Sequence, residues 1–245
     1  VRVCGADPDE APEQLRRSLG VVFQSSVLDQ VLSVQENLRS RAALYGIRGT
    51  AFSRRLAELT DLLELGELLR TPARQLSLGQ RMRCEIAAAL LHEPKILFLD
   101  EPTIGLDAVS KAAVRGFIRT CNKERGTTVI LTTHDMQDIE ALAERILLIG
   151  RGRILLDGTL DELKRRRPAQ RRLTVAYGGG ALPVVEGLTP LRDADGHAEL
   201  LLDTDLLSVS EAVARISAQT EVKDLSVSGE SIEELVVSLY REYRI

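Results

Sequence analysis

Hydrophobic positions along the chain form short unbroken runs that alternate with stretches of helical periodicity. The unbroken runs have the length of strands and cover Leu19–Phe23, Ile96–Leu99 and Thr127–Thr133. Continuous apolar runs of this kind are typical of strands that are buried on both faces of a parallel sheet. Strands that alternate with helices therefore predict a largely parallel sheet and an α/β fold.

Helices are expected between these runs. Two of them begin with a capping box, in which a Ser N-cap is followed three residues later by Glu or Gln: Ser33 with Glu36, and Ser77 with Gln80. The helix after Ser77 repeats apolar residues on one face and ends before Pro94. Further helices are expected over three other stretches, 9–18, 53–64 and 107–124.

The pattern changes after the third strand. Two short apolar runs, 146–149 and 154–156, flank a Gly-containing turn and predict a hairpin. A basic run at 164–172 is typical of a linker. Beyond it, strands are expected at 173–177, 198–202 and 222–227, a turn at Gly178–Gly180, and helices at 206–219 and 231–243. The chain thus divides into a large domain, 1–163, the linker, and a small α+β domain, 173–245.

Composition narrows the possible classes of protein. The chain has 245 residues, of which 44% are hydrophobic and 28% charged, as in ordinary globular domains. Its net charge of −4 argues against a surface that coats nucleic acid. No apolar run approaches the roughly 18 residues of a membrane span, so a role at a membrane requires a partner. Three cysteines without metal-ligand spacing are expected to be free thiols.

Two adjacent carboxylates, Asp100 and Glu101, follow the second predicted strand. Open α/β sheets place their ligands at the carboxyl ends of the strands. One carboxylate there can hold Mg²⁺, a cation that prefers oxygen ligands, while the next orients a water molecule for phosphate chemistry. A strand end with solvated acids would be the simpler interpretation if this pair stood alone.

The pair does not stand alone, because the stretch 76–107, LSLGQRMRCEIAAALLHEPKILFLDEPTIGLD, resembles three consecutive motifs of ATP-binding cassette (ABC) ATPases. By position, Ser77, Gly79 and Gln80 match the signature motif, Asp100 the Walker B aspartate, Glu101 the catalytic glutamate, and Gly105–Asp107 the D-loop. Two further segments extend the resemblance. GVVFQ, ending at Gln24, is similar to the Q-loop, and TTHD, containing His134, is similar to the switch-histidine loop.

The resemblance implies a P-loop NTPase-type (RecA-like) fold with an inserted helical subdomain at about 33–78. It implies that two nucleotide-binding subunits, identical or different, enclose two ATP molecules with Mg²⁺. Asp100 and Gln24 would then serve Mg²⁺, Glu101 the attacking water, and His134 the γ-phosphate. Ser77, Gly79 and Gln80 would serve the ATP of the opposite subunit, with the D-loop Asp107 at the dimer interface.

A membrane permease is the further partner that the resemblance implies, and nucleic acid is not expected to be one. The subunit would lie in the cytoplasm, attached through the permease to the inner face of the cell membrane. The segment 173–245 resembles the small C-terminal domain appended to drug- and antibiotic-exporting ABC ATPases, which favours an exporter.

The sequence departs from the family at one motif. No G-x-x-x-x-G-K-[ST] phosphate loop occurs in the 245 residues, and the chain opens with Val1–Val3, which alternates like a strand and precedes a turn at Gly5–Pro8. We interpret the chain as an ABC ATPase without its first few dozen residues, active only in the complete protein.

Two alternatives to a transporter subunit remain open. One is a soluble ABC ATPase that acts on nucleic acid or the ribosome, although the 52 positions between Gln24 and Leu76 leave no room for a long coiled coil. The other is a non-catalytic fragment that donates only the signature half-site.

The isolated chain is expected to bind Mg-ATP no more tightly than about millimolar, roughly −4 kcal/mol, and to hydrolyse essentially none. The reason is that a cluster of backbone amides and a Lys in the phosphate loop neutralise most of the triphosphate charge. Isothermal titration calorimetry of the 245-residue chain with Mg-ATP measures this affinity. A micromolar dissociation constant would reveal a phosphate site elsewhere in the sequence.

Overall fold

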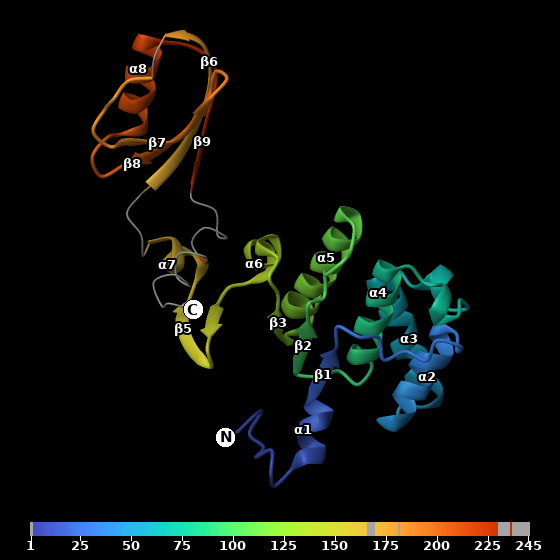
Figure 1. Cartoon of the computed structure of the whole chain (residues 1–245). Helices are drawn as coiled ribbons and strands as arrows, with labels where there is room; N and C mark the ends of the chain where they lie inside the picture. Colours follow the sequence, from blue (N-terminus) through green and yellow to red (C-terminus); the bar gives the residue numbers. More distant parts are fainter. Residues whose placement is uncertain (1, 166–169, 181, 230–235, 237–245) are drawn as a thin grey trace. The chain divides into compact units, whose positions relative to one another are not determined.

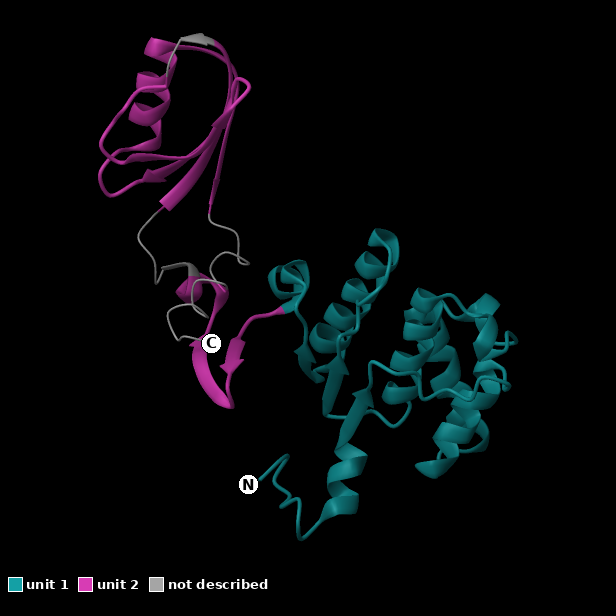
Figure 2. Ribbon diagram, viewed as in Figure 1, with its two compact units in different colours: residues 1–142 teal, residues 143–245 magenta. Residues whose placement is uncertain are grey.

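The computed structural model of the chain describes residues 2–165, 170–180, 182–229 and 236 (Figure 1). The fold has two compact units, residues 1–142 and 143–245 (Figure 2). Among the described residues, nearly all buried hydrophobic residues of the first unit form one core, whereas those of the second unit form two smaller clusters. The expected boundary between a domain 1–163 and a domain 173–245 stays a prediction.

The first unit is built on a parallel sheet of three strands in the order β1-β2-β3. These strands are β1 (Leu19–Val22), β2 (Ile96–Asp100) and β3 (Thr128–Thr132). Val22 lies opposite Leu99, and Asp100 lies opposite Thr132. The predicted parallel α/β architecture is confirmed, and each strand end lies within one residue of the position expected from the hydrophobic runs.

Helices connect and cover these strands. They are α1 (Pro12–Ser18), α2 (Val34–Leu44), α3 (Gly49–Leu63), the 3₁₀ turns η1 (Gly66–Leu68) and η2 (Ala73–Gln75), α4 (Leu78–Leu90), α5 (Ala108–Arg125) and α6 (Met136–Leu142). Both predicted capping boxes are present, at Ser33 and at Ser77. Asp107 is the N-cap of α5, and Gly126 ends that helix in the left-handed conformation.

The central helix α4 packs against β1, and one glycine permits its close approach. A Cβ atom added at Gly20 would lie 2.7 Å from the backbone oxygen of Ala89. The carboxyl end of α4 is held by Arg55, whose guanidinium donates to the carbonyl oxygens of Leu90 (2.7 Å) and Leu91 (3.3 Å). Those carbonyls have no partner within the helix, so Arg55 satisfies them inside the core.

The strand expected at Val1–Val3 is wrong for the part of it that the structure describes. Val3 and Ala6 instead close a tight turn, with N–H to O=C bonds of 2.8 and 3.0 Å in the two directions. Cys4 and Gly5 take positive φ angles of 50° and 83° in this turn. The chain reverses after Val3, so no strand develops there.

The second unit begins with the predicted hairpin, which is confirmed as β4 (Ile146–Gly150) and β5 (Arg153–Gly158). A short helix, α7 (Leu160–Arg165), follows. Among residues 170–180 and 182–229, the structure shows an antiparallel sheet of order β7-β8-β6-β9 with one helix. Its members are β6 (Gln170–Gly180), β7 (Leu188–Ala194), β8 (His197–Asp203), α8 (Val209–Gln219) and β9 (Thr220–Gly229).

One expectation for this unit is wrong, and one strand was not expected. Gly178–Gly180 does not form a turn but continues β6, and the side chain of Lys223 lies over Gly178, where a Cβ atom would come 2.6 Å from Lys223 Cε. Strand β7 was not expected, because as an exposed edge strand containing Pro190 it lacks the alternation that reveals a half-buried strand. The expected helix at 231–243, except residue 236, and linker residues 166–169 lie outside the described residues.

The contact at Gly20 makes a matched pair of variants informative. Gly20→Ala is expected to lower the free energy of unfolding by about 1–3 kcal/mol, because the new methyl group meets backbone of α4. Gly116→Ala, in the exposed middle of α5 with nothing within 4 Å, is expected to raise it by roughly 0.5–1 kcal/mol. Urea denaturation followed by circular dichroism measures both. Equal effects of the two variants would contradict the packing described here.

Candidate functional site

Three of the predicted site segments meet at one edge of the parallel sheet. Asp100 is the last residue of β2, Gln24 follows β1 by two positions, and His134 follows β3 by two positions. Because the strands are parallel and in register, their carboxyl ends lie side by side. The structure therefore brings Gln24, Asp100, Glu101 and His134 to the same edge.

Glu101 and His134 are in direct contact. Nδ1 of His134 lies 2.8 Å from Oε1 of Glu101. The Glu101 side chain is only 21% exposed, whereas the His134 side chain is 71% exposed and its ring is open to an incoming ligand. Glu101 has a φ angle of 50°, and its backbone N–H donates to the carbonyl of Thr132. Non-glycine residues in this conformation cost free energy and cluster at functional sites.

The carboxylate of Glu101 raises the pKa of His134, first through the hydrogen bond to the ring and then through its charge. Asp135 contributes in the same direction, while desolvation and Lys111 oppose it. The ring therefore carries more positive charge near neutral pH than an isolated histidine does.

Asp100 and Gln24 offer oxygen atoms at the same edge. Both side chains are exposed, and Oδ1 of Asp100 accepts a hydrogen bond of 2.6 Å from the Thr132 hydroxyl. No cluster of three or more His, Cys, Asp or Glu residues suited to a metal ion occurs in the described part of the chain. A small set of hard oxygen donors suits Mg²⁺, which keeps several waters and binds through one or two carboxylates plus substrate phosphates.

The signature and D-loop residues form a second cluster, at the start of α4 and α5. Ser77 and Gln80 cap α4, and the buried Gly79 lies so close to Ser110 that a Cβ atom would come 2.5 Å from its hydroxyl. Asp107 accepts from the backbone N–H groups of Val109 and Ser110 and from the Ser110 hydroxyl. The bonds from Ser110, led by its N–H, lower the pKa of Asp107. The two motifs are therefore packed together within one chain.

Comparison with known proteins shows which family has this arrangement. Residues 1–104 match the ABC transporter family. The chain is 32% identical to the daunorubicin resistance ATP-binding protein DrrA3 of Streptomyces coeruleorubidus, over 98% of this chain and 77% of that protein. It is 34% identical to the daunorubicin/doxorubicin resistance ATP-binding protein DrrA of Streptomyces peucetius, over 97% and 74%. The chain belongs to the ABC transporter family.

Solved structures agree with this assignment. The ATP-binding subunit of an ABC transporter superposes with a TM-score of 0.58 at 28% identity, over 67% of this chain and 68% of that one. A dimeric ATP-binding cassette in a post-hydrolysis state with ADP and Pi gives 0.56 at 28% identity, over 64% and 72%. This chain is therefore an ATP-binding subunit with the fold of the ABC ATPases.

Sequence reasoning missed a buried carboxylate, Glu85, in helix α4. Oε1 of Glu85 accepts from the Ser26 hydroxyl (2.5 Å) and from the backbone N–H groups of Val27 (2.9 Å) and Leu28 (3.3 Å). These bonds fix the segment after Gln24 to α4. The signal in the sequence was a single acidic residue inside the otherwise apolar run Cys84–Leu90. In the structure every residue of this run is buried.

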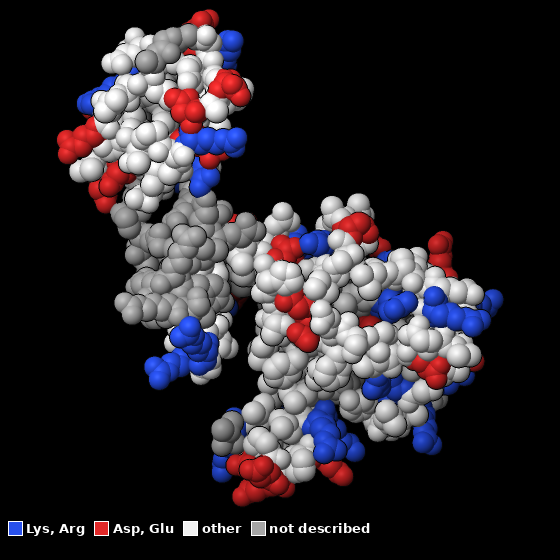
Figure 3. Space-filling view, in the orientation of Figure 1, with Lys and Arg blue, Asp and Glu red and all other residues white. Residues whose placement is uncertain are grey.

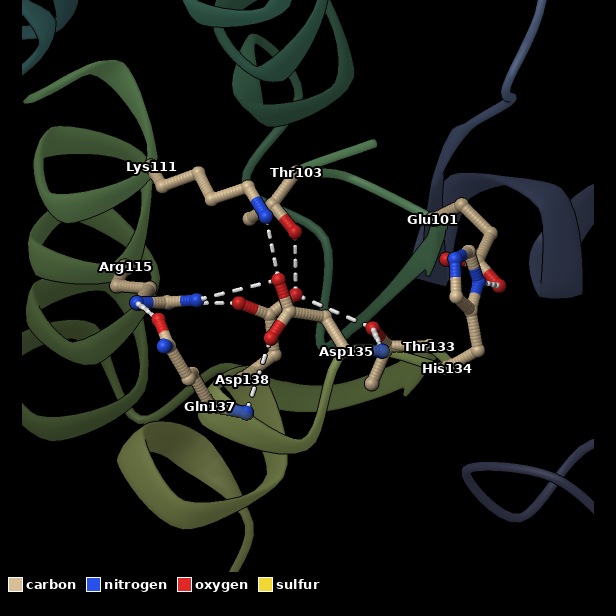
Figure 4. A network of polar contacts seen from close by, with 9 residues as sticks. All are labelled: Glu101, Thr103, Lys111, Arg115, Thr133, His134, Asp135, Gln137 and Asp138. Carbon is tan, nitrogen blue, oxygen red and sulfur yellow. Dashed lines mark hydrogen bonds and ion pairs between the residues drawn. The ribbon is translucent and has the colours of Figure 1, made fainter. Parts of the chain in front are cut away.

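Sequence reasoning also missed a polar network beside the Glu101–His134 contact (Figure 4). Its centre is Asp138 of α6, whose side chain is 0% exposed. Thr103, Arg115 and Thr133 all bond to it. The sequence signal for this network was one acidic residue, Asp138, four positions after His134.

Two surface observations complete the description. On the face shown in Figure 3, basic and acidic side chains are interspersed and do not gather into a patch of one sign. Among the described residues, none of the helices combines the length and hydropathy needed to span a bilayer.

The Glu101–His134 contact predicts a pH dependence. Because the folded-state pKa of His134 is raised, the contact stabilises the fold fully below the unfolded-state pKa, and this contribution is lost as the pH rises through the folded value. Nuclear magnetic resonance titration of the imidazole proton should show a pKa above about 6.5, the ordinary value. The titration of a Glu101→Gln variant should move back toward that value. An identical pKa in both proteins would show that the contact does not form in solution.

Proposed function

We propose that this chain supplies two parts of an ATP-hydrolysing subunit that drives an ABC exporter. One is the catalytic edge, which we define as the sheet edge that carries Gln24, Asp100, Glu101 and His134. The other is the signature half-site. The observation that carries the proposal is the 2.8 Å contact of Glu101 with His134 at the carboxyl ends of adjacent parallel strands. An acid held against an exposed imidazole at this edge can act on water and on a phosphate in the same site.

In this proposal Glu101 orients the attacking water, and His134 binds the γ-phosphate. The raised pKa of His134 supports its part, because an imidazolium ring stabilises the charge of the transferred phosphoryl group. The bond from the Glu101 N–H to the Thr132 carbonyl holds the left-handed backbone that carries the carboxylate.

Asp100 and Gln24 are the residues that would hold Mg²⁺. Their fit rests on the chemistry of the donors, since both are exposed oxygen-bearing side chains at the catalytic edge. The Thr132 hydroxyl bonds to one Asp100 oxygen and fixes the orientation of the carboxylate. When bound, the ion would neutralise phosphate charge.

The signature cluster is proposed to serve the ATP of a second nucleotide-binding subunit, identical or different. The first N–H groups of α4 have no partner within the helix, and a helix N-terminus favours anions. Ser77 at this end is exposed, and Asp107 is the N-cap of α5, whose Ser110 lies against Gly79. The dimeric post-hydrolysis cassette is the structural precedent for two such subunits acting together.

A membrane permease is the proposed third component, which would place the subunit in the cytoplasm at the inner face of the membrane. The surface after β1 supports a protein partner, because Phe23, Val27 and Val31 are exposed apolar residues around Gln24. The names of the relatives, which refer to daunorubicin and doxorubicin resistance, support the export of drug-like molecules. They do not favour a soluble ABC ATPase acting on nucleic acid.

Substitution of Glu101 tests the proposal in the assembled transporter. Glu101→Gln keeps the size of the side chain but removes its charge, so ATP should still bind and dimerise the subunits while steady-state hydrolysis nearly stops. Glu124→Gln, an exposed acid at the far end of α5, is the matched control. Turnover of Glu101→Gln within about threefold of wild type, roughly 0.65 kcal/mol in the barrier, would contradict the proposed role.

Substitution of His134 is a separate test of the same site. His134→Ala should abolish most of the hydrolysis measured in the assembled transporter, because the charge that faces the γ-phosphate is lost. A mild effect would assign His134 a purely structural part.

A further inference from the structure

Asp138 is a buried acid that contacts the loops of the catalytic edge but not Glu101 or His134. Asp138 lies in α6, and its carboxylate is completely inaccessible to solvent. A buried carboxylate is tolerated only when it is paired and hydrogen-bonded. The structure provides one cation and two hydroxyl groups for it, and each comes from a different element.

One oxygen of Asp138 joins two loops. The hydroxyls of Thr103 and Thr133 both donate to Oδ2 of Asp138, the latter at 3.1 Å. Thr103 lies two residues after Glu101, and Thr133 is the neighbour of His134. The loops that carry the two catalytic side chains are therefore fastened to the same atom (Figure 4).

The other carboxylate oxygen of Asp138, Oδ1, connects these two loops to α5. Arg115 donates through Nε to Oδ1 of Asp138 at 2.6 Å. One turn earlier, Lys111 pairs with Asp135, which also lies 3.6 Å from Arg115 Nη2. Lys111 lowers the pKa of Asp135, so this second carboxylate is charged and anchors the His134 loop to the same helix.

We infer that Asp138 is a positioning residue, which sets the separation of Glu101 and His134 by holding both of their loops against α5. The inference rests on the proposed catalytic roles of those two residues. Glu101 has a backbone conformation that needs surrounding structure to maintain it, and the Thr103–Asp138 bond supplies a support two residues away. The side chain of Asp138 contacts neither nucleotide nor water in this scheme.

Thr103→Val is the cleanest variant, because it keeps the volume of the side chain and removes only the hydroxyl that reaches Asp138. Thr127→Val is the matched control, since Thr127 is also buried and its hydroxyl bonds to the Pro94 carbonyl at the opposite end of β3. Thr103→Ser restores the hydroxyl. Asp138→Asn removes the charge at the centre, but the inference does not depend on whether that variant folds.

In the assembled transporter, Thr103→Val is expected to lower kcat at least about tenfold, because small misplacements of reacting groups are costly. KM for Mg-ATP should change less than about twofold, since the hydroxyl does not serve nucleotide binding. Thr127→Val and Thr103→Ser should both keep kcat near the wild-type value. Thr103→Val and Asp138→Asn combined should cost less than the sum of the two single effects, because the Thr103–Asp138 bond is shared by both.

A second readout, on the isolated chain, needs no hydrolysis. The groups that face His134 are Glu101, Asp135 and Lys111. If Thr103→Val loosens the Glu101 loop, the pKa of His134 should fall toward its ordinary value in a magnetic resonance titration, whereas Thr127→Val should leave it unchanged.

Two results overturn the inference: a kcat for Thr103→Val within about twofold of wild type, or an unchanged pKa of His134. Glu101→Gln is measured in the same assay to separate this outcome from failure of the proposed function. If Glu101→Gln stops hydrolysis and Thr103→Val does not, only the role of Asp138 is wrong. If Glu101→Gln retains turnover, the catalytic assignment itself is wrong.

Discussion

The parallel register of β2 between β1 and β3 is the constraint on which the site depends. Val22 pairs with Leu99, and Asp100 pairs with Thr132, so the chain leaves all three strands at the same level. Residues separated by more than a hundred positions, such as Gln24 and His134, reach one edge for this reason alone. A slip of the register of β2 by one residue would turn its side chains to the opposite face of the sheet and separate Glu101 from His134.

Much of this arrangement could be predicted from the sequence, because its signals are local. Apolar runs located the three strands to within one residue, and the Ser77–Gln80 spacing located the start of α4. Motif order then identified Asp100, Glu101 and His134 as candidates for one site. Parallel pairing needed only the alternation of strands and helices, which is a rule about chain connections.

The supporting contacts could not be predicted, since they depend on which distant segments meet. Nothing in the sequence states that Glu85 accepts from Ser26, or that Thr103 and Thr133 share an oxygen of Asp138. Edge strand β7 was not predicted because its residues are exposed and do not alternate between apolar and polar side chains. Gly178–Gly180 was wrongly predicted to be a turn because glycine favours turns, whereas here Gly178 lets the Lys223 side chain lie across the strand. At Gly178–Gly180 a tertiary contact thus overrides the local preference.

Two of the missed contacts, those of Glu85 and Asp138, have a buried carboxylate in common. Asp138 forms a buried ion pair with Arg115, and removal of one partner from such a pair typically costs about 3–5 kcal/mol, whereas the pair by itself adds little stability over apolar packing. Glu85 has hydroxyl and backbone N–H partners, which offset the cost of burying a polar group. Glu85 and Asp138 are therefore better explained by the geometry that they impose than by the stability that they add. Each accepts hydrogen bonds from a loop of the catalytic edge, and such bonds have directional requirements that apolar contacts lack.

The two helices that carry these contacts begin at the other cluster. Helix α4 starts at Ser77 in the signature segment, and eight residues later Glu85 binds the segment after Gln24. Helix α5 starts at Asp107 in the D-loop, and eight residues later Arg115 binds Asp138. Eight residues of α-helix span about 12 Å. Because a hydrogen-bonded helix is stiff over that length, the position of each N-cap constrains a loop of the catalytic edge. Each of these two helices thus connects a segment proposed to face a second subunit with a segment next to the residues proposed to be catalytic.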